Sequence, residues 1–412
     1  MSRQPGAART LAEWVVAVEP SADDLALAQR ALTDTIAVAL AAREHPILRT
    51  AASLSEAGRW AVACHILDFD DLHMPTTTHI STVCVPVALS SGGDHRAYLA
   101  GAGVMARLGA TLGWRHYSSG WHASTTAGAL AAAVTASYAR GLDAEAVARA
   151  MALAVPAAGG VQRSFGTDAK SLQIGFAAEA GIRAATLAAA GATAEPAAVD
   201  DWLSLVGGDA GAVAVEGPVV PDGLAIKMYP CCYALQRPIS AVAEIAGGVT
   251  PESVRRIVVR TPAGTVTPLI HHRPKTGLEG KFSLEYAAAA ALLDEHQGIA
   301  SFSDTAVLRP EAQRLVELVE VELTEGGDWL LAGEVQVEVH TDTGVRRNSL
   351  GFPPGSPQRP PSPEEFARKV ADCLTGLRLD PAAITWSRGA HLLREHLASY
   401  RDEVRSASTP TT

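Results

Sequence analysis

Apolar residues recur at helical spacing through most of the first 190 residues. The clearest example is the run from Leu25 to Leu40, which Ser21, Asp23 and Asp24 precede as an N-terminal capping signal. The spacing predicts two helices over residues 10–42 and further helices over 47–69, 83–112, 123–139, 143–155 and 172–190. Small residues dominate these segments, and Ala and Gly let helix axes approach closely. The first half of the chain therefore predicts a compact helical bundle.

The pattern changes after about residue 220, where apolar and polar residues begin to alternate. Alternation typical of strands runs over 255–261, 315–323 and 333–340, and the intervening residues 283–293 predict a helix. Residues 352–363, FPPGSPQRPPSP, hold six prolines and predict a loop or linker. Helical patterns return over 364–376 and 388–404.

These patterns predict a fold that is mainly α with an inserted α+β domain. The helical domain takes residues 1–222 and 366–412, and the α+β domain takes residues 223–365, including the Pro-rich linker. The tail SASTPTT, residues 406–412, is expected to be disordered.

Composition excludes several function classes. The chain has 34 Lys and Arg against 44 Asp and Glu, a net charge of −10, which argues against a nucleic-acid partner but not against a small acidic substrate. Five cysteines without a CxxC spacing predict neither a disulfide framework nor a zinc ribbon or iron–sulfur cluster. The absence of a signal peptide and of a long apolar run predicts a soluble, cytoplasmic protein.

The densest candidate for chemistry is the segment from Cys64 to His79, which holds three Asp and three His in 16 residues. On a continuous helix, Asp68, Asp71 and Leu72 would share a face with His65. This density suits a metal site or acid–base catalysis, and it equally suits a solvated acidic turn at a helix end. No HExxH motif supports a metal.

A second candidate is the hydroxyl-rich turn from Ser118 to Gly128, which delivers His122 to the start of an Ala-rich helix. Free N–H groups at a helix N-terminus favour carboxylate binding, and they would lower the pKa of a nearby His so that it serves as a neutral base. The alternative is a capping turn with an incidental His.

Isolated lysines mark two further positions. Lys170 is the only lysine in the first 220 residues and could bind a carboxylate as a point charge. Lys227 opens the run KMYPCC where the composition changes, and domain junctions favour ligand pockets. Tyr286, in KFSLEY, opens the helix of the inserted domain and either points into a cleft or packs.

Taken together, these motifs resemble the MmgE/PrpD family, whose members include 2-methylcitrate dehydratase, cis-aconitate decarboxylase and iminodisuccinate epimerase. The resemblance covers nearly the whole chain and rests on LAEWVVAVEPSADDLALAQRALTDTIAVALA, HILDFDDLH…HIST, GWHASTTAG, AKSLQIGFAAEAG, KMYPCCYALQRPISA and KFSLEYAAAAALLD. It implies a large helical domain with a smaller lid domain, a homodimer and an active site between the domains. The flat apolar faces of the Ala-rich helices also favour a homodimer.

By motif position the resemblance assigns a catalytic role to five residues: Asp68, His79, His122, Lys170 and Tyr286. It also implies a set of substrate-binding positions: Lys227, Cys232, Gln236, Leu72 and Ser124. Four residues depart from the family pattern. Leu72 stands where relatives commonly carry Thr, and Cys232, Gln236 and Gln173 stand where relatives can carry His. This loss of polar groups argues against the decarboxylase and towards another di- or tricarboxylate, or an amino-acid-derived analogue.

The resulting hypothesis is a cofactor-independent, metal-free lyase of dehydratase type. A base would remove the proton α to a carboxylate, an acid would protonate the departing hydroxyl, and Asp68 would orient a histidine. An epimerase or a decarboxylase would use the same deprotonated or enolate-like intermediate for a different outcome. A non-catalytic carboxylate-binding protein and a metal-dependent hydrolase are the alternatives from other classes.

Overall fold

The computed structural model describes residues 6–397, which divide into two compact units. The helical unit comprises residues up to 225 and from 373 onward, and the mixed unit comprises residues 226–372. The sequence pattern predicts the corresponding two boundaries at 222/223 and 365/366. The difference at the second boundary arises because helix α17 (Pro363–Cys373) is grouped, except for its last residue, with the mixed unit.

Within the described residues, the helical unit consists of helices and the segments that connect them, with isolated β-bridges such as the one between Leu72 and Ala225. Its helices are α1 (Ala7–Ala17), α2 (Ala22–Ala41), α3 (Ile47–Thr50), α4 (Glu56–His65), α5 (Ser81–Ser90), α6 (His95–Ser118), α7 (Ala123–Ala139), α8 (Ala144–Ala154), α9 (Ala169–Ala189), α10 (Ala198–Leu205) and α18 (Trp386–Leu397). The capping signal at Ser21 forms a capping box with Asp24, so α2 begins where the sequence predicts.

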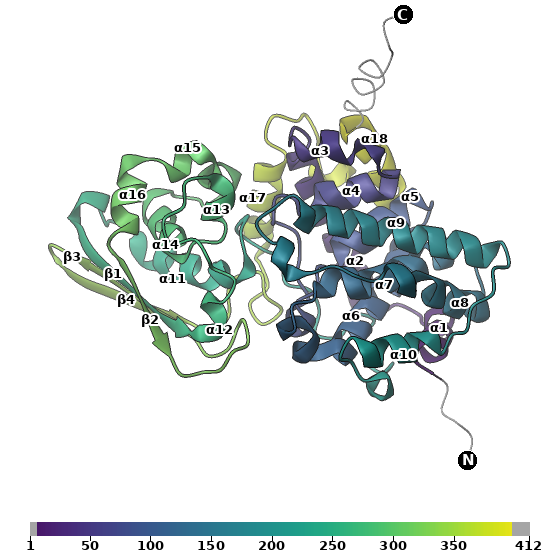
Figure 1. Cartoon of the computed structure of the whole chain (residues 1–412). Helices are drawn as coiled ribbons and strands as arrows, with labels where there is room; N and C mark the ends of the chain where they lie inside the picture. Colours follow the sequence, from purple (N-terminus) through teal and green to yellow (C-terminus); the bar gives the residue numbers. More distant parts are fainter. Residues whose placement is uncertain (1–5, 398–412) are drawn as a thin grey trace, which may run out of the picture. The chain divides into compact units, whose positions relative to one another are not determined.

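Helix α7 lies at the centre of this unit, and its residues from 123 to 137 are all buried. It packs against α6, α8 and α9, which surround it in Figure 1. The α7–α9 contact is so close that a Cβ at Gly181 would lie 2.3 Å from the Cβ of Ala132. Small residues therefore allow α9 to pack directly on α7. This contact fixes the first turn of α7 and the first turn of α9 relative to each other.

The mixed unit is a four-stranded sheet with helices. Its strands are β1 (Val254–Pro262), β2 (Val319–Thr324), β3 (Val335–Thr341) and β4 (Gly344–Leu350), in the order β2-β1-β3-β4. Its other helices are α11 (Gln236–Ala246), α12 (Ala263–Val266), α13 (Gly277–Gly280), α14 (Leu284–Leu293), α15 (Asp304–Val307) and α16 (Pro310–Val316). Strand β1 pairs parallel with β2 and antiparallel with β3.

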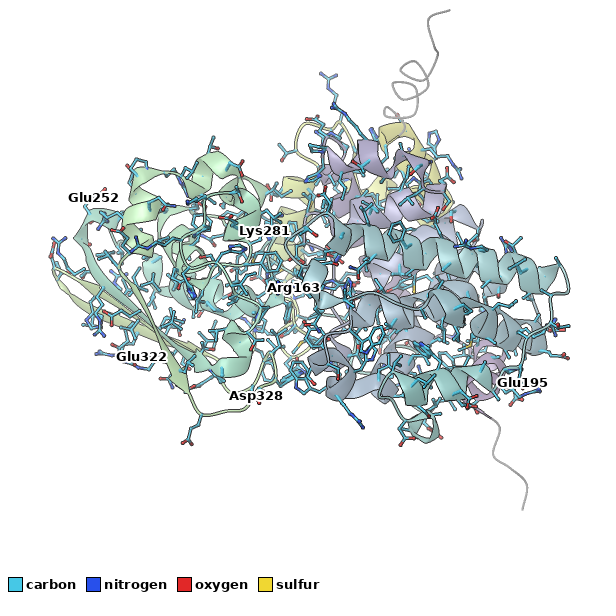
Figure 2. The ribbon with its side chains drawn as sticks, in the orientation of Figure 1. Arg163, Glu195, Glu252, Lys281, Glu322 and Asp328 are labelled. Atoms are coloured by element: carbon cyan, nitrogen blue, oxygen red, sulfur yellow. The ribbon has the colours of Figure 1, made fainter. Side chains whose placement is uncertain are left out.

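The sheet separates an apolar packing layer from a charged one. Helices α11 and α14 pack on the sheet, as Figure 1 shows. Ion pairs also join neighbouring strands of the sheet. Arg256 of β1 pairs with Glu320 of β2, and Arg260 of β1 pairs with Glu322 of β2 and Glu338 of β3. Glu322 is labelled in Figure 2. The mainly α fold with an α+β part is thus confirmed.

Several predicted elements differ from the observed ones. The helix expected over 47–69 is broken into α3, a short 3₁₀ turn and α4, and the one over 83–112 is interrupted at Gly92, whose φ is +74°. Residues 315–318 close α16 before β2 begins, whereas the sequence assigned them to a strand. The tail at 406–412 lies outside the described residues, as does the end of the helix expected to reach 404.

The lengths and hydropathy of these helices bear on membrane insertion. Between residues 6 and 397, none combines the length and the apolar character that a membrane span requires.

Candidate active site

The Asp-rich segment begins where α4 ends, at His65. Asp68 adopts a φ of +55°, a left-handed conformation that costs a residue with a side chain roughly 1–3 kcal/mol and is concentrated at functional sites. The chain is therefore a turn here, and the prediction that Asp68 and Asp71 share a helical face with His65 is wrong. The turn sends the three carboxylates of this segment to three different sets of partners.

Asp70 contacts two histidines with one oxygen. Its Oδ2 lies 2.8 Å from Nδ1 of His65 and 3.0 Å from Nδ1 of His79. Burial raises the pKa of Asp70, but the charges and hydrogen bonds of the two histidines outweigh it and hold that pKa well below its ordinary value. Burial lowers the pKa of His65 to about 4. At neutral pH an ionised Asp70 therefore accepts a hydrogen bond from Nδ1–H of a neutral His65, which leaves the lone pair on Nε2.

A third imidazole, His122, lies near the two that contact this carboxylate. The ring centroids of His65 and His79 lie 4.7 Å apart, edge to face, and those of His65 and His122 lie 6.3 Å apart. Among residues 6–397, no group hydrogen-bonds to Nε2 of His65 or to Nε2 of His122, although both atoms are buried. Buried polar atoms are nearly always paired, so these two nitrogens indicate a place for a ligand or water.

His122 occupies the N-cap position of α7, as the sequence predicts. Its Nδ1 lies 3.3 Å from Oε1 of Gln173, and the edge of Phe165 meets its ring at a centroid distance of 5.0 Å. Burial lowers the pKa of His122 well below its ordinary value, with smaller contributions from the charges of His65 and Lys170. The expected low pKa is present, but burial rather than the helix terminus is its main cause.

Lys170 stands in the first turn of α9 and forms an ion pair with Asp68. The distance from Nζ to Oδ1 is 2.9 Å, and the side chains are 12% and 7% exposed. The ammonium also lies 5.5 Å from the ring centroid of Phe165, in the loop that Arg163 marks in Figure 2. Asp68 was expected to orient a histidine; the carboxylate that contacts histidines is Asp70, and Asp68 contacts Lys170.

Two family models match the chain. The MmgE/PrpD N-terminal domain covers residues 57–203, and the MmgE/PrpD C-terminal domain covers residues 229–383. The chain belongs to the MmgE/PrpD family. The N-terminal match contains the whole cluster of histidines, carboxylates and lysine just described.

The chain is similar to several curated cis-aconitate decarboxylases. The protein from Homo sapiens is 28% identical over 63% of this chain and 60% of its own length, and the one from Mus musculus is 30% identical over 63% and 59%. A relative from Aspergillus terreus is 24% identical over 68% and 66%. The chain spans about three fifths of the length of the mammalian relatives that it matches.

The third carboxylate of the segment, Asp71, lies away from the histidines in a separate buried network. Its Oδ1 accepts a hydrogen bond of 3.2 Å from the main-chain N–H of Ser81, at the start of α5. Burial raises the pKa of Asp71 to about 7, and the charges of Asp34 and Asp70 add to this effect. This MmgE/PrpD chain therefore holds a carboxyl group that keeps its proton close to neutral pH.

Two other predicted site residues of the helical unit have structural contacts. The Ser124 hydroxyl accepts a hydrogen bond of 2.9 Å from the main-chain N–H of His79, and this bond fixes the backbone at that histidine. Leu72 pairs through its main chain with Ala225, at distances of 2.9 and 2.8 Å, and its side chain is 3% exposed. Their proposed contacts with substrate stay predictions.

Tyr286, in the mixed unit, is buried inside that unit. Its hydroxyl donates a hydrogen bond to the carbonyl of Ser301, and its ring meets Phe302 edge to face. Burial raises the pKa of Tyr286 to about 12. Its catalytic role stays a prediction.

The turn that follows Lys227 is organised by Gln236. The Gln236 side chain accepts hydrogen bonds from the main-chain N–H groups of Met228 and Tyr229 at 3.0 and 3.1 Å. Cys232 is half-buried, and Lys227 is 1% exposed. Gln236 thus shapes the turn, and the convergence of these residues with those of the helical unit stays a prediction.

His65, Asp70 and His79 also form a set of possible metal ligands, with one donor atom of each lying within 4.8 Å of the others. Two imidazoles and a carboxylate are a donor set that zinc accepts. Both Nδ1 atoms already lie at hydrogen-bond or ion-pair distance from a single oxygen, Oδ2 of Asp70. Oδ1 of Asp70 and Nε2 of His65 remain without a hydrogen-bond partner within residues 6–397, so the contacts among the three side chains leave donor atoms available.

Proposed function

We propose that this chain is a cofactor-independent lyase of dehydratase type that acts on a small di- or tricarboxylate. The observation that carries the proposal is the pair of buried, neutral imidazoles, His65 and His122, each with a buried Nε2 that no described residue occupies. A neutral imidazole with an available lone pair is a general base. The Lys170 ammonium in the same cluster is suited to a substrate carboxylate.

The proposed reaction begins when Nε2 of His122 removes the proton α to a carboxylate. The electron pair of the broken C–H bond moves onto that carbon, and the adjacent carboxylate becomes enolate-like. Lys170 and the N–H groups at the start of α7 would stabilise the growing negative charge. The C–O bond at the β carbon then breaks, a protonated group supplies a proton to the departing hydroxyl, and water and an unsaturated acid are released.

The names of the relatives favour decarboxylation as a second candidate. In that reaction the C–C bond to a carboxylate breaks, its electron pair passes to the same kind of enolate-like centre, and carbon dioxide leaves before a proton is added. Both reactions require stabilised negative charge at one carbon. Dehydration requires a base in its first step, whereas decarboxylation requires a proton donor in its last step. The neutral histidines of this chain are suited to act as the base, which favours dehydration.

The deciding experiment is a screen of di- and tricarboxylates in deuterated water, followed by NMR and by measurement of released carbon dioxide. We expect loss of water with deuterium exchange at the α carbon. Release of carbon dioxide would assign the decarboxylase instead, and exchange with inversion and no net loss would assign an epimerase. Tight binding without exchange or turnover would refute an enzymatic function.

Two controls accompany the screen. His116 is a matched buried histidine whose two ring nitrogens are occupied by the Val206 carbonyl and the Thr126 hydroxyl. Replacing His116 with Gln should leave turnover per folded molecule close to wild type, whereas His122→Gln should lower it by about 10²–10⁴-fold. Activity should also survive a chelator. Loss with a chelator and recovery with a divalent ion would assign the reaction to a metal at His65, Asp70 and His79.

A further inference from the structure

Gln173, on the second turn of α9, links His122 to the loop that precedes that helix. Its Oε1 accepts a hydrogen bond of 2.9 Å from the main-chain N–H of Val161 and lies 3.3 Å from Nδ1 of His122. Its Nε2 lies 3.4 Å from the carbonyl oxygen of Val161. The loop itself is held to the histidine, because the main-chain N–H of His122 donates to the carbonyl of Gly160 at 3.0 Å.

The backbone of Val161 decides which way the amide of Gln173 points. A main-chain N–H can only donate, so it requires the amide oxygen, and a main-chain carbonyl can only accept, so it requires the amide NH₂. The amide oxygen therefore faces His122. Since that oxygen is only an acceptor, the proton of the neutral imidazole must lie on Nδ1, and the lone pair must lie on Nε2.

We infer that Gln173 is a positioning residue that holds His122 in the tautomer with an unprotonated Nε2. The inference rests on the proposed function, because this nitrogen is the proposed base. His116 provides a contrast, since its two ring nitrogens are both occupied by protein groups. At His122 one nitrogen is held by Gln173, and the other is buried with no hydrogen-bond partner among residues 6–397.

The loop is shaped to make this contact. Gly160 has a φ of +115°, and a Cβ at this position would lie 2.5 Å from Oε1 of Gln173 and 2.1 Å from Oγ1 of Thr125. Only glycine allows the loop to approach both side chains so closely. The neutral amide also matters, because a carboxylate in its place would stabilise the imidazolium, raise the pKa of His122 and leave less of the ring in its neutral, proton-accepting form as the pH falls.

The test combines histidine tautomers with pH–rate profiles in the full-length protein. In ¹⁵N-histidine NMR, with His122 assigned by comparison with His122→Gln, the wild type should show a neutral ring protonated on Nδ1. Gln173→Leu should lose this single tautomer and lower kcat by about 10–100-fold, the usual effect of removing such a support, with a smaller change in KM. Gln173→Glu should keep the tautomer and move both the His122 titration and the acid limb of the rate profile to higher pH.

Gln162→Leu is the matched control. Gln162 belongs to the same loop, and its side-chain amide donates to the main-chain carbonyls of Tyr117 and Trp121 rather than to the His122 ring. This variant should leave the His122 tautomer unchanged. The inference is overturned if Gln173→Leu keeps the wild-type tautomer, or if Gln173→Glu leaves the His122 titration unmoved; should the Leu variant not fold, the Glu variant decides. NMR needs no turnover, so an inactive protein with the expected tautomers would refute only the proposed function.

Discussion

Replacing Asp71 with Asn should stabilise the protein, and increasingly so as the pH rises. Asp71 is 1% exposed, and burial raises its pKa to about 7, against about 3.8 in an unfolded chain. Between these two values the folded state holds a proton that the unfolded state releases. The free energy of unfolding therefore falls as pH rises through this window, because the unfolded state binds fewer protons.

The magnitude follows from the two pKa values. At 1.36 kcal/mol for each pH unit, ionising Asp71 costs the folded state up to about 4 kcal/mol once the pH exceeds 7. Asn removes this cost, because its neutral amide can still accept the hydrogen bond from the N–H of Ser81. Its NH₂ group would replace an oxygen that has no hydrogen-bond partner within residues 6–397.

The assay is chemical unfolding followed by circular dichroism at pH 4.5, 6 and 8. The difference in unfolding free energy between Asp71→Asn and wild type should be small at pH 4.5 and should grow by a few kcal/mol by pH 8. Asp201→Asn, which removes the same charge from an exposed position on α10, provides the control and should show no such growth. A difference for Asp71→Asn that is independent of pH would refute the buried, protonated carboxyl group.

Three further substitutions test the cluster of the helical unit. His122→Ala should lower kcat by about 10²–10⁴-fold with a smaller change in KM, and retained turnover would make His79 the better candidate for proton transfer. Lys170→Ala should raise KM, and it should lower the melting temperature because it removes the cation that pairs with the buried Asp68 carboxylate. The double variant with Asp68→Asn should recover the melting temperature but not KM. Asp70→Asn should lower kcat by about 10–100-fold while the chain stays folded, because the imidazoles lose the carboxylate that orients them, and unchanged kinetics would contradict that role.

Features that depend on local spacing could be predicted from the sequence. The Ala-rich run after His122 forms α7 as expected, and the hydroxyl-rich turn places His122 at its N-cap. Lys170 also lies in the cluster, on α9. In each of these cases one helix and its first turn determine the position, so the residues themselves carry the necessary information.

The pairing of side chains could not be predicted, because it depends on backbone turns and on distant segments. The left-handed backbone at Asp68 ends the helical periodicity there, which the sequence pattern does not indicate, and the expectation that Asp68 orients a histidine is wrong because Asp70 has that contact. Nothing in the local pattern indicates that Gln173 meets Val161 and His122, since this contact needs α9 to be fixed against α7. The edge strand β4 was missed because it is mostly polar and exposed.

The charges of the Asp-rich turn limit how a polycarboxylate can be bound. Asp70 is ionised and its partner His65 is neutral, Asp71 keeps its proton up to about pH 7, and the negative charge of Asp68 is balanced by Lys170. These groups together carry a net negative charge at neutral pH, so Lys170 alone does not compensate an incoming substrate carboxylate. We propose that the remaining positive charge comes from outside this set, and Lys227 is the residue that the family pattern offers. On this argument Lys227→Met should raise KM at least as much as Lys170→Met, and equal binding without Lys227 would show that main-chain N–H groups suffice.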